Sequence, residues 1–153
     1  MRRHEARLRG FLCRVTGDPA LADDVAQDAF LLAYERIDDF SGEGSFASWL
    51  YRIAYRRFLD LRRSHHRRVR REAGGGHIES PPPSDGAAID LDRALASLSE
   101  AERTVVLLCY GAGLSHAEAA SVLSMPLGTV KSHANRGRAK AAAYFKGSEN
   151  GDA

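Results

Sequence analysis

The feature that most constrains this chain is a Gly- and Pro-rich stretch near its middle. Gly74-Gly75-Gly76 allows wide backbone freedom, and Pro81-Pro82-Pro83 removes three amide donors and favours extended backbone. The chain has 153 residues, so this stretch leaves two segments that each have the size of a small domain. We therefore expect a first domain at residues 1–70, a flexible linker at 71–88, a second domain at 89–146 and a disordered tail at 147–153.

Before the linker, apolar residues recur at intervals of three and four, the period of an α-helix. The sequence Gly17-Asp18-Pro19 should end the first helix and start the second, with Asp18 as its N-cap and Pro19 at its first position. We expect this second helix at residues 20–38 and a third from Ser45 to Arg63 or beyond. The buried stripe predicted for the second helix consists of Leu21, Val25, Ala29, Leu32 and Ile37.

After the linker, two Ser residues are each followed by Glu three positions later, the capping-box pattern of a helix start. The pairs are Ser99 with Glu102 and Ser115 with Glu118. A turn at Ser124-Met125-Pro126 precedes a last helix, whose apolar side should contain Val130, Ala134, Ala141 and Phe145. With no alternating strand pattern, the predicted fold is all-α: two small helical domains joined by a Gly/Pro-rich linker, the C-terminal one a helix-turn-helix.

The formal net charge is only +2, but the charges are segregated along the chain. Residues 18–43 contain eight acidic residues and one Arg, whereas residues 52–71 contain nine Arg and one Asp. Residues 129–146 contain five Lys or Arg and no acid. Segregation of this kind indicates separate surfaces for separate partners, although a charged run can also be a solvated helix face.

Enzymatic and metal-binding motifs are not found in the sequence. The His residues are scattered or paired, Cys13 and Cys109 lack metal-ligand spacing, and no phosphate-binding loop follows a strand. The apolar runs are too short to cross a bilayer, and no signal-peptide pattern opens the chain. We expect no catalytic residues, no metal, no cofactor, no direct membrane insertion and a cytoplasmic location.

Three helix faces have the residue types of binding surfaces. On the last helix, Lys131, Ser132, Asn135 and Arg136 are of the types that read base edges in a major groove, unless this is a basic face of an ordinary bundle.

On the third helix, Trp49, Tyr51 and Tyr55 are interleaved with Arg, a combination suited to unpaired DNA, unless the aromatic rings are core. On the second helix, the acidic face around Asp24 and Asp28 would be repelled by DNA. It suits a basic protein surface, unless it is simply solvated.

Four segments resemble one family. Residues 23–30 (DDVAQDAF) resemble region 2.2 of sigma-70-family factors, and residues 46–54 (FASWLYRIA) resemble region 2.3 of their extracytoplasmic-function (ECF) group. The segment from residues 98–103 through 113–120 resembles regions 4.1 and 4.2, and residues 125–133 (MPLGTVKSH) resemble the start of the recognition helix. The four segments occur in family order, on both sides of the linker.

The resemblance implies a sigma factor that directs core RNA polymerase to specific promoters and assists promoter opening. Binding to the polymerase, at the beta-prime clamp helices and the beta subunit, would involve Asp24, Gln27, Asp28 and Leu31. The minus-ten element would be opened and read by Trp49, Arg52, Arg56, Arg57, Asp60 and Arg63. The minus-thirty-five element would be read by Thr129, Lys131, Ser132, His133, Asn135 and Arg136. The resemblance also implies an anti-sigma factor as a partner and no enzymatic activity.

The sequence departs from the family pattern at two places. The first region 2 helix is expected to be shortened or largely absent, and Arg56 stands where many relatives have a small polar residue. Arg56 would then clamp a phosphate instead of reading a base. Two other functions remain open: a helix-turn-helix regulator that binds duplex DNA without polymerase, and a sigma-like adaptor that sequesters a partner.

Overall fold

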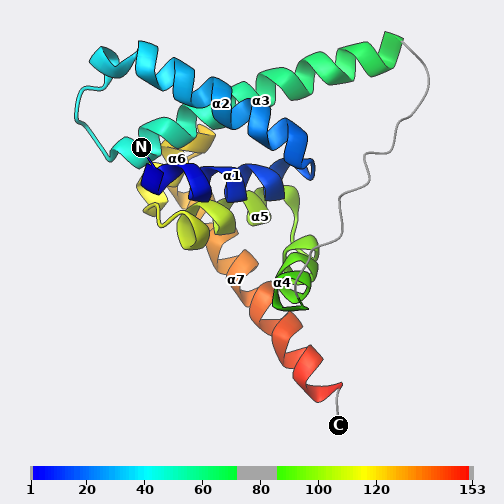
Figure 1. The fold of residues 1–153 in the computed structure, drawn as a ribbon. Coiled ribbons are helices and arrows are strands. Elements are labelled where there is room, and N and C mark those ends of the chain that lie inside the picture. The colour runs from blue at the N-terminus through cyan, green and yellow to red at the C-terminus, as the bar shows by residue number, and fades with distance from the viewer. Residues whose placement is uncertain (1, 72–85, 152–153) are drawn as a thin grey trace. The chain divides into compact units, whose positions relative to one another are not determined.

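The computed structural model describes residues 2–71 and 86–151, and all regular elements in these ranges are helical (Figure 1). They form two compact units; the first consists mainly of residues before the undescribed stretch at 72–85, and the second mainly of residues after it. The all-α prediction is therefore confirmed for the described residues. The runs Gly74-Gly75-Gly76 and Pro81-Pro82-Pro83, on which the linker prediction depends, lie outside them.

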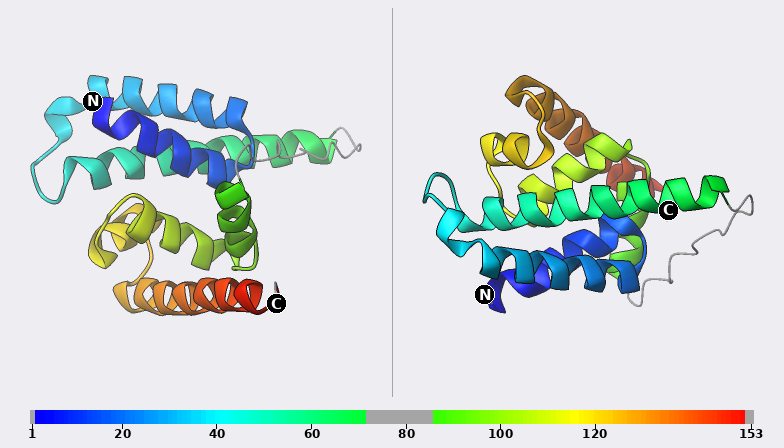
Figure 2. Two further views of the ribbon diagram at one scale, coloured as in Figure 1. Left: turned by 60° about the horizontal axis from the view of Figure 1, so that its bottom comes forward. Right: turned by 90° about the horizontal axis from the view of Figure 1, so that it is seen from above.

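The first unit consists of α1 (Arg2–Thr16), α2 (Pro19–Glu35), a 3₁₀ turn η1 (Ile37–Asp39) and α3 (Phe46–Arg71). Figure 2 shows α2 and α3 side by side, and α1 packs mainly on α2. The predicted start of α2 is confirmed, because the Asp18 side chain accepts hydrogen bonds from the backbone amides of Ala20 and Leu21.

The core of the first unit forms where the apolar stripes of its three helices meet. It combines large side chains from α1 and α3 with mostly small ones from α2, which lets the helices approach closely. Its members are Leu8, Phe11, Leu12, Ala22, Val25, Ala26, Ala29, Ala33, Leu50, Tyr51, Ala54 and Phe58. The predicted buried position of Ile37 is wrong: α2 ends at Glu35, and η1 turns Ile37 outward to 46% exposure.

The second unit contains α4 (Gly86–Ala96), α5 (Glu100–Val106), a π-helical turn η2 (Leu107–Gly111), most of α6 (His116–Leu123) and α7 (Leu127–Asn150). Helix α7 packs on both α5 and α4.

Both predicted capping boxes of the second unit are present. The Ser99 and Ser115 hydroxyls accept from the amides of Glu102 and Glu118, whose carboxylates accept from the two Ser amides.

Several boundaries and buried positions differ from the sequence-based expectation. Helix α3 includes Arg71, α4 starts at Gly86, and α7 continues to Asn150, so helices extend into the predicted linker and tail. Phe145, expected on the buried side of α7, is 41% exposed.

Candidate functional site

The solvent-facing side of α2 presents acidic and apolar side chains together. Asp24 and Gln27 are exposed, and Leu31 is 63% exposed, one turn after Gln27. Tyr34, three residues further on, is 73% exposed. Large apolar side chains this open on a well-packed helix point to a binding surface. Tyr34 was missed from the sequence, although its position one turn after Leu31, away from the buried stripe, was the signal that could have found it.

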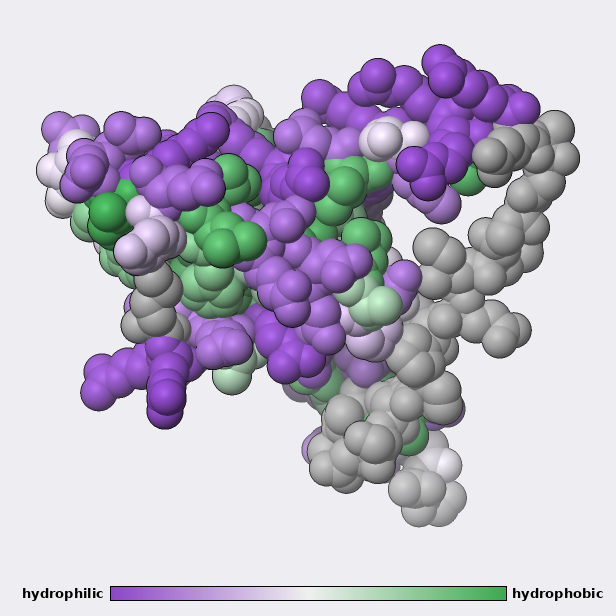
Figure 3. Space-filling model, turned by 45° about the horizontal axis from the view of Figure 1, so that its top comes forward, coloured by the Kyte–Doolittle hydropathy of each residue, from purple (hydrophilic) through white to green (hydrophobic). Residues whose placement is uncertain are grey.

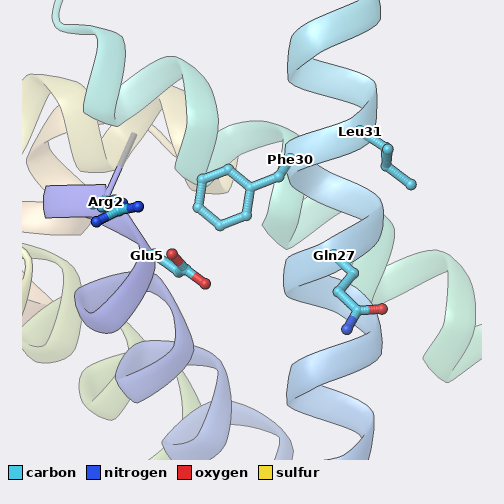
Figure 4. Close-up of a pocket in the computed structure, with 5 residues that line it drawn as sticks. All are labelled: Arg2, Glu5, Gln27, Phe30 and Leu31. Carbon is cyan, nitrogen blue, oxygen red and sulfur yellow. The ribbon is translucent and has the colours of Figure 1, made fainter.

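A pocket of about 520 Å³ opens beside this face, between α1 and α2 (Figure 4). Phe30 points from α2 towards Arg2 and Glu5 of α1, whereas Leu31 points away from α1 (Figure 4). Gln27 and Leu31 complete the lining of the pocket. The lining combines the apolar side chains of Phe30 and Leu31 with the charged groups of Arg2 and Glu5, a combination that suits a protein-binding surface. Its α1 residues were not predicted, because the pairing of α1 with α2 is not visible in the sequence.

Asp28, the other acidic residue predicted on this face, is held by α3. Its Oδ2 atom accepts a hydrogen bond from Arg57 Nε at 2.8 Å, and both side chains are 39% exposed. Asp28 and Arg57 were predicted for two different surfaces, polymerase and DNA. The ion pair connects the two surfaces. It also occupies one carboxylate oxygen of Asp28 and one N–H donor of Arg57, which are then not available to another partner.

The remaining predicted DNA-contacting residues of α3 do share a face. Trp49, Arg52, Arg56, Asp60 and Arg63 follow one another at steps of three and four residues. Arg56, Asp60 and Arg63 are exposed, and Arg52 is half-buried. The guanidinium groups on this face can bind the phosphates of a polyanion.

The aromatic residues of α3 divide between surface and core. Trp49 is half-buried in a cluster with Phe40 and Phe46, at ring-centroid distances of 5.4 and 5.7 Å. Tyr51 is 1% exposed and its ring centroid lies 5.3 Å from that of Phe11, so of the two alternatives for the aromatic residues the core position holds for Tyr51. Burial raises the pKa of Tyr51 to about 12, and its Oη atom has no hydrogen-bond partner among the described residues.

In the second unit, α6 and α7 are joined by the predicted tight turn. Ser124 adopts a left-handed conformation (φ 52°), and the amides of Ser124 and Met125 both donate to the Ala120 carbonyl. Such a C-cap closes the end of α6 and lets the chain reverse within three residues. Pro126 then precedes the first residue of α7, Leu127.

The predicted reading residues lie on the first turns of α7. Val130 and Ala134 are fully buried, which turns the intervening polar residues outward. Among the predicted reading residues, only His133 is half-buried. The other five are exposed: Thr129, Lys131, Ser132, Asn135 and Arg136.

Two contacts fix α7 against α5. Gly137 lies so close to α5 that an added Cβ would be 2.6 Å from Val106 Cγ2. One turn further, Lys140 Nζ donates to both carboxylate oxygens of Glu102, at 2.9 and 3.1 Å. The Glu102 side chain is 6% exposed, and the hydrogen bond from Lys140 is the main cause of its lowered pKa.

Arg136 is connected to the same carboxylate. Its Nε atom is 3.6 Å from Glu102 Oε1, and one of its terminal nitrogens is 3.1 Å from His133 Nδ1. His133 and Arg136, both predicted to read bases, therefore contact each other, and Arg136 also contacts Glu102, which caps α5. Glu102 was predicted only as a cap, because its contacts with α7 depend on the docking of the two helices.

Other kinds of site are not present in the described ranges. No group of three or more His, Cys, Asp or Glu side chains there could hold a metal ion. Among the helices described, none combines the length and apolar character needed to cross a membrane. The free thiols of Cys13 and Cys109 are half-buried, and burial raises the pKa of each.

Comparisons with known families match both units. Residues 1–68 match the family model for sigma-70 region 2, and residues 88–140 match that for sigma-70 region 4. The ECF RNA polymerase sigma factor SigK of Mycolicibacterium vanbaalenii is 34% identical over 86% of this chain and 72% of its own length. The ECF sigma factor EcfG of Rhodopseudomonas palustris is 31% identical over 94% of this chain and 82% of its own length.

Solved structures give the same result. The sigma factor RpoE of Bartonella quintana, in complex with the anti-sigma factor NepR, matches with a TM-score of 0.81 and 28% identity. That match covers 94% of this chain and 92% of RpoE. CnrH, in complex with the cytosolic domain of CnrY, matches with a TM-score of 0.67 and 28% identity, over 95% of this chain and 84% of CnrH.

Proposed function

Because this chain belongs to the ECF group of the sigma-70 family, the non-enzymatic sigma factors of transcription initiation, we propose that it directs core RNA polymerase to specific promoters and assists their opening. One observation carries the proposal: one unit combines an acidic-apolar face on α2 with an Arg-rich face on α3, and the other contains α6, a tight turn and the basic helix α7. A regulator that binds DNA alone needs only the second unit.

The two units then have different tasks. Residues 1–70 would act as the region 2 domain and residues 89–146 as the region 4 domain, joined by a flexible linker at 71–88. In the second domain, α6 and α7 would form the helix-turn-helix, with α7 as the recognition helix. The limits of the two family matches and the capped, closely turned α6–α7 pair support this division.

Polymerase binding is assigned to the α2 face. Asp24 and Asp28 supply negative charge for basic residues of the beta-prime clamp helices, and Gln27 and Leu31 supply the polar and apolar contacts between them. The exposure of Leu31 and Tyr34 supports this role, since an exposed apolar stripe bordered by charge is what a helix-binding surface requires. The beta subunit is proposed as a second contact.

Promoter recognition is assigned to α3 and α7. On α3, Trp49, Arg52, Arg56, Arg57, Asp60 and Arg63 would open and contact the minus-ten element. On α7, the minus-thirty-five element would be read in the major groove by Thr129, Lys131, Ser132, His133, Asn135 and Arg136. The exposed stripe on each helix supports these assignments. Arg57 has fewer N–H donors available for DNA, because its Nε atom already donates to Asp28.

Regulation by an anti-sigma factor is part of the proposal. RpoE and CnrH, both similar to this chain over most of its length, were each solved with such a protein or its cytosolic domain. An anti-sigma factor that covered the exposed α2 stripe would block polymerase access. We place the protein in the cytoplasm with the polymerase and assign it no metal or cofactor.

The test is transcription in vitro with purified core polymerase over a genomic promoter library, with and without this protein. We expect new, discrete start sites that share a two-part promoter motif. Binding of duplex DNA without polymerase association would favour a stand-alone regulator. Polymerase or partner binding without new start sites would favour an adaptor.

A further inference from the structure

Glu102 of α5 is the only charged residue that is buried within the described ranges. A buried carboxylate is removed from water, so it requires hydrogen-bond donors or opposite charges close by. Capping of α5 uses one of these interactions, the hydrogen bond that Glu102 Oε2 accepts from the Ser99 amide at 3.1 Å. The same side chain also faces α7, the helix assigned to the minus-thirty-five element.

Neither the cap nor the α5–α7 link explains the contact of Glu102 with Arg136. A capping box works equally well with an uncharged Gln, and Lys140 already links the helices through two hydrogen bonds. Arg136 Nε is 3.6 Å from Glu102 Oε1, beyond hydrogen-bond distance, and the Arg136 side chain is 58% exposed. Such a contact adds little to stability, but the charge attraction determines where the guanidinium group lies.

The two neighbours of Arg136 contact one side of its planar guanidinium group. Nε lies towards Glu102, and Nη2 is 3.1 Å from His133 Nδ1. Arg has only donors, so His133 Nδ1 accepts this hydrogen bond and the neutral ring has its hydrogen on Nε2. Within the described chain Nη1 has no hydrogen-bond partner, which leaves the terminal edge of the guanidinium group available.

Other Arg residues are not held in this way. The C-terminal end of α3 presents a nearly continuous hydrophilic surface (Figure 3), where Arg67, Arg68 and Arg71 are exposed and form no ion pair within the described ranges. A side chain of that kind loses rotamer freedom when it binds, which lowers affinity about two- to tenfold. Arg136 is already oriented by its neighbours, so a smaller part of this loss applies to it.

We propose that Glu102 is a positioning residue for promoter recognition, whose negative charge orients Arg136 so that the terminal edge of the guanidinium group meets the minus-thirty-five element. The proposal rests on the sigma function proposed above and deepens it. The terminal edge has two parallel N–H groups, which match a pair of acceptors such as O6 and N7 of guanine. Glu102 itself would not touch the DNA, because it is buried between α5 and α7.

The test variant is Glu102→Gln, which removes the charge but keeps an oxygen acceptor for the Ser99 amide. The matched control is Lys140→Gln, which removes the hydrogen bonds between Lys140 and Glu102 but leaves Glu102 beside Arg136. Both variants weaken the α5–α7 link, so both should lose stability. Urea unfolding measures this loss, and only the test variant should change the orientation of Arg136.

The main measurement is binding of holoenzyme, assembled from core polymerase and full-length protein, to promoters in which each base pair of the minus-thirty-five element is changed in turn. The variant Arg136→Ala identifies the base pair that Arg136 reads, because the preference at that position is lost. We expect Glu102→Gln to reduce the same preference about two- to tenfold and to leave the preference read by Lys131 unchanged. Lys140→Gln should keep both preferences.

A double variant separates action through Arg136 from a general effect on the fold. In the presence of Arg136→Ala, adding Glu102→Gln should cause no further loss of base preference, because the residue that Glu102 orients is already absent. Any loss of stability caused by Glu102→Gln should persist in the double variant.

A measurement on the unaltered protein does not depend on the folding of any variant. NMR order parameters of the Arg side chains should show Arg136 Nε–H to be more restricted than Arg138 Nε–H. Arg138 is exposed on the same helix and forms no ion pair within the part of the chain that the structure describes. Equal mobility of the two side chains would overturn the proposal.

Three binding results would also overturn it. Glu102→Gln could lower affinity equally for every promoter sequence, Lys140→Gln could reduce the same base preference as much, or the double variant could lose further preference. If Arg136→Ala changes no base preference while the unaltered holoenzyme binds promoters specifically, only this proposal fails. If the unaltered holoenzyme forms no promoter-specific complex, the proposed function fails as well.

Discussion

Asp24 and Asp28 are one turn apart on α2, yet their surroundings differ. Asp24 is exposed, whereas Asp28 is 2.8 Å from Arg57 of α3. The sequence pattern treats the two residues alike, because it contains no information on which α3 residue faces α2. A substitution of Asp24 therefore tests partner binding alone, whereas a substitution of Asp28 also removes an ion pair that holds α2 to α3.

We expect Asp24→Lys to weaken core-polymerase binding about tenfold and to change the free energy of unfolding by less than about 0.5 kcal/mol. Asp28→Lys should also destabilise the fold, by about 1 kcal/mol, because it replaces a partly exposed ion pair with two like charges. Polymerase pull-down and urea unfolding measure the two effects. Unchanged affinity of the Asp24 variant would contradict the role assigned to this face.

Tyr51 shows a second difference between pattern and structure at the level of one residue. Its hydroxyl is buried without a described hydrogen-bond partner, so Tyr51→Phe should raise the free energy of unfolding by about 1 kcal/mol. Tyr34→Phe, at a 73% exposed position, serves as the control and should change stability little. A large loss of stability in the Tyr51 variant would show that the hydroxyl has a partner.

Among the helices, the α5–α7 contact is the most closely determined. Gly137 permits this contact, so Gly137→Ala should destabilise the second unit by about 1–3 kcal/mol, despite the higher helix propensity of Ala. Gly147→Ala, where an added Cβ would have open space, should instead stabilise α7 by up to about 1 kcal/mol. Thermal unfolding compares the two variants. Adding Val106→Ala should restore part of the stability of the Gly137 variant, since Val106 supplies the closest atom.

The Glu102–Lys140 hydrogen bonds make the same contact sensitive to acid. The pKa of Glu102 is lowered in the folded state, so its contribution to stability is fully present above its unfolded-state pKa and is lost as pH falls through the lower folded value. We expect stability to decrease on acidification below about pH 5, and Glu102→Gln to make this decrease smaller. Thermal unfolding from pH 7 to pH 3 measures it. Lys140→Gln should give a similar profile, and an unaltered profile in both variants would exclude this pair as the cause.

For the whole molecule, the proposed promoter contacts lie in two separate units. Arg56→Ala in α3, where the Arg is assigned a phosphate contact, should weaken binding equally for all promoter sequences, whereas Lys131→Ala in α7 should cost roughly 1–3 kcal/mol for each specific base interaction that is removed. Because the two residues lie in different units, the effects should add to within about 0.5 kcal/mol. Holoenzyme binding to promoters with one or both elements changed measures this. Lys131 is a better probe than Arg136, because Arg136 also contacts His133 and Glu102.

Much of the fold could be predicted from sequence, because its signals are local. The Asp18 cap and both capping boxes join residues two or three positions apart, so the residue types suffice to predict them. The helices follow from periodicity, and the family follows from short motifs in order. The assigned site residues on α3 and α7 share exposed faces for the same reason, since the helical period alone orders them.

The partners of those residues follow instead from tertiary packing. The Asp28–Arg57 and Glu102–Lys140 contacts join residues 29 and 38 positions apart, and they depend on how helices dock. The same docking buries Tyr51, leaves Trp49 at the rim of an aromatic cluster and requires Gly at position 137. A helical pattern determines which residues share a face, but the neighbouring helix determines whether that face is core, ion pair or open surface.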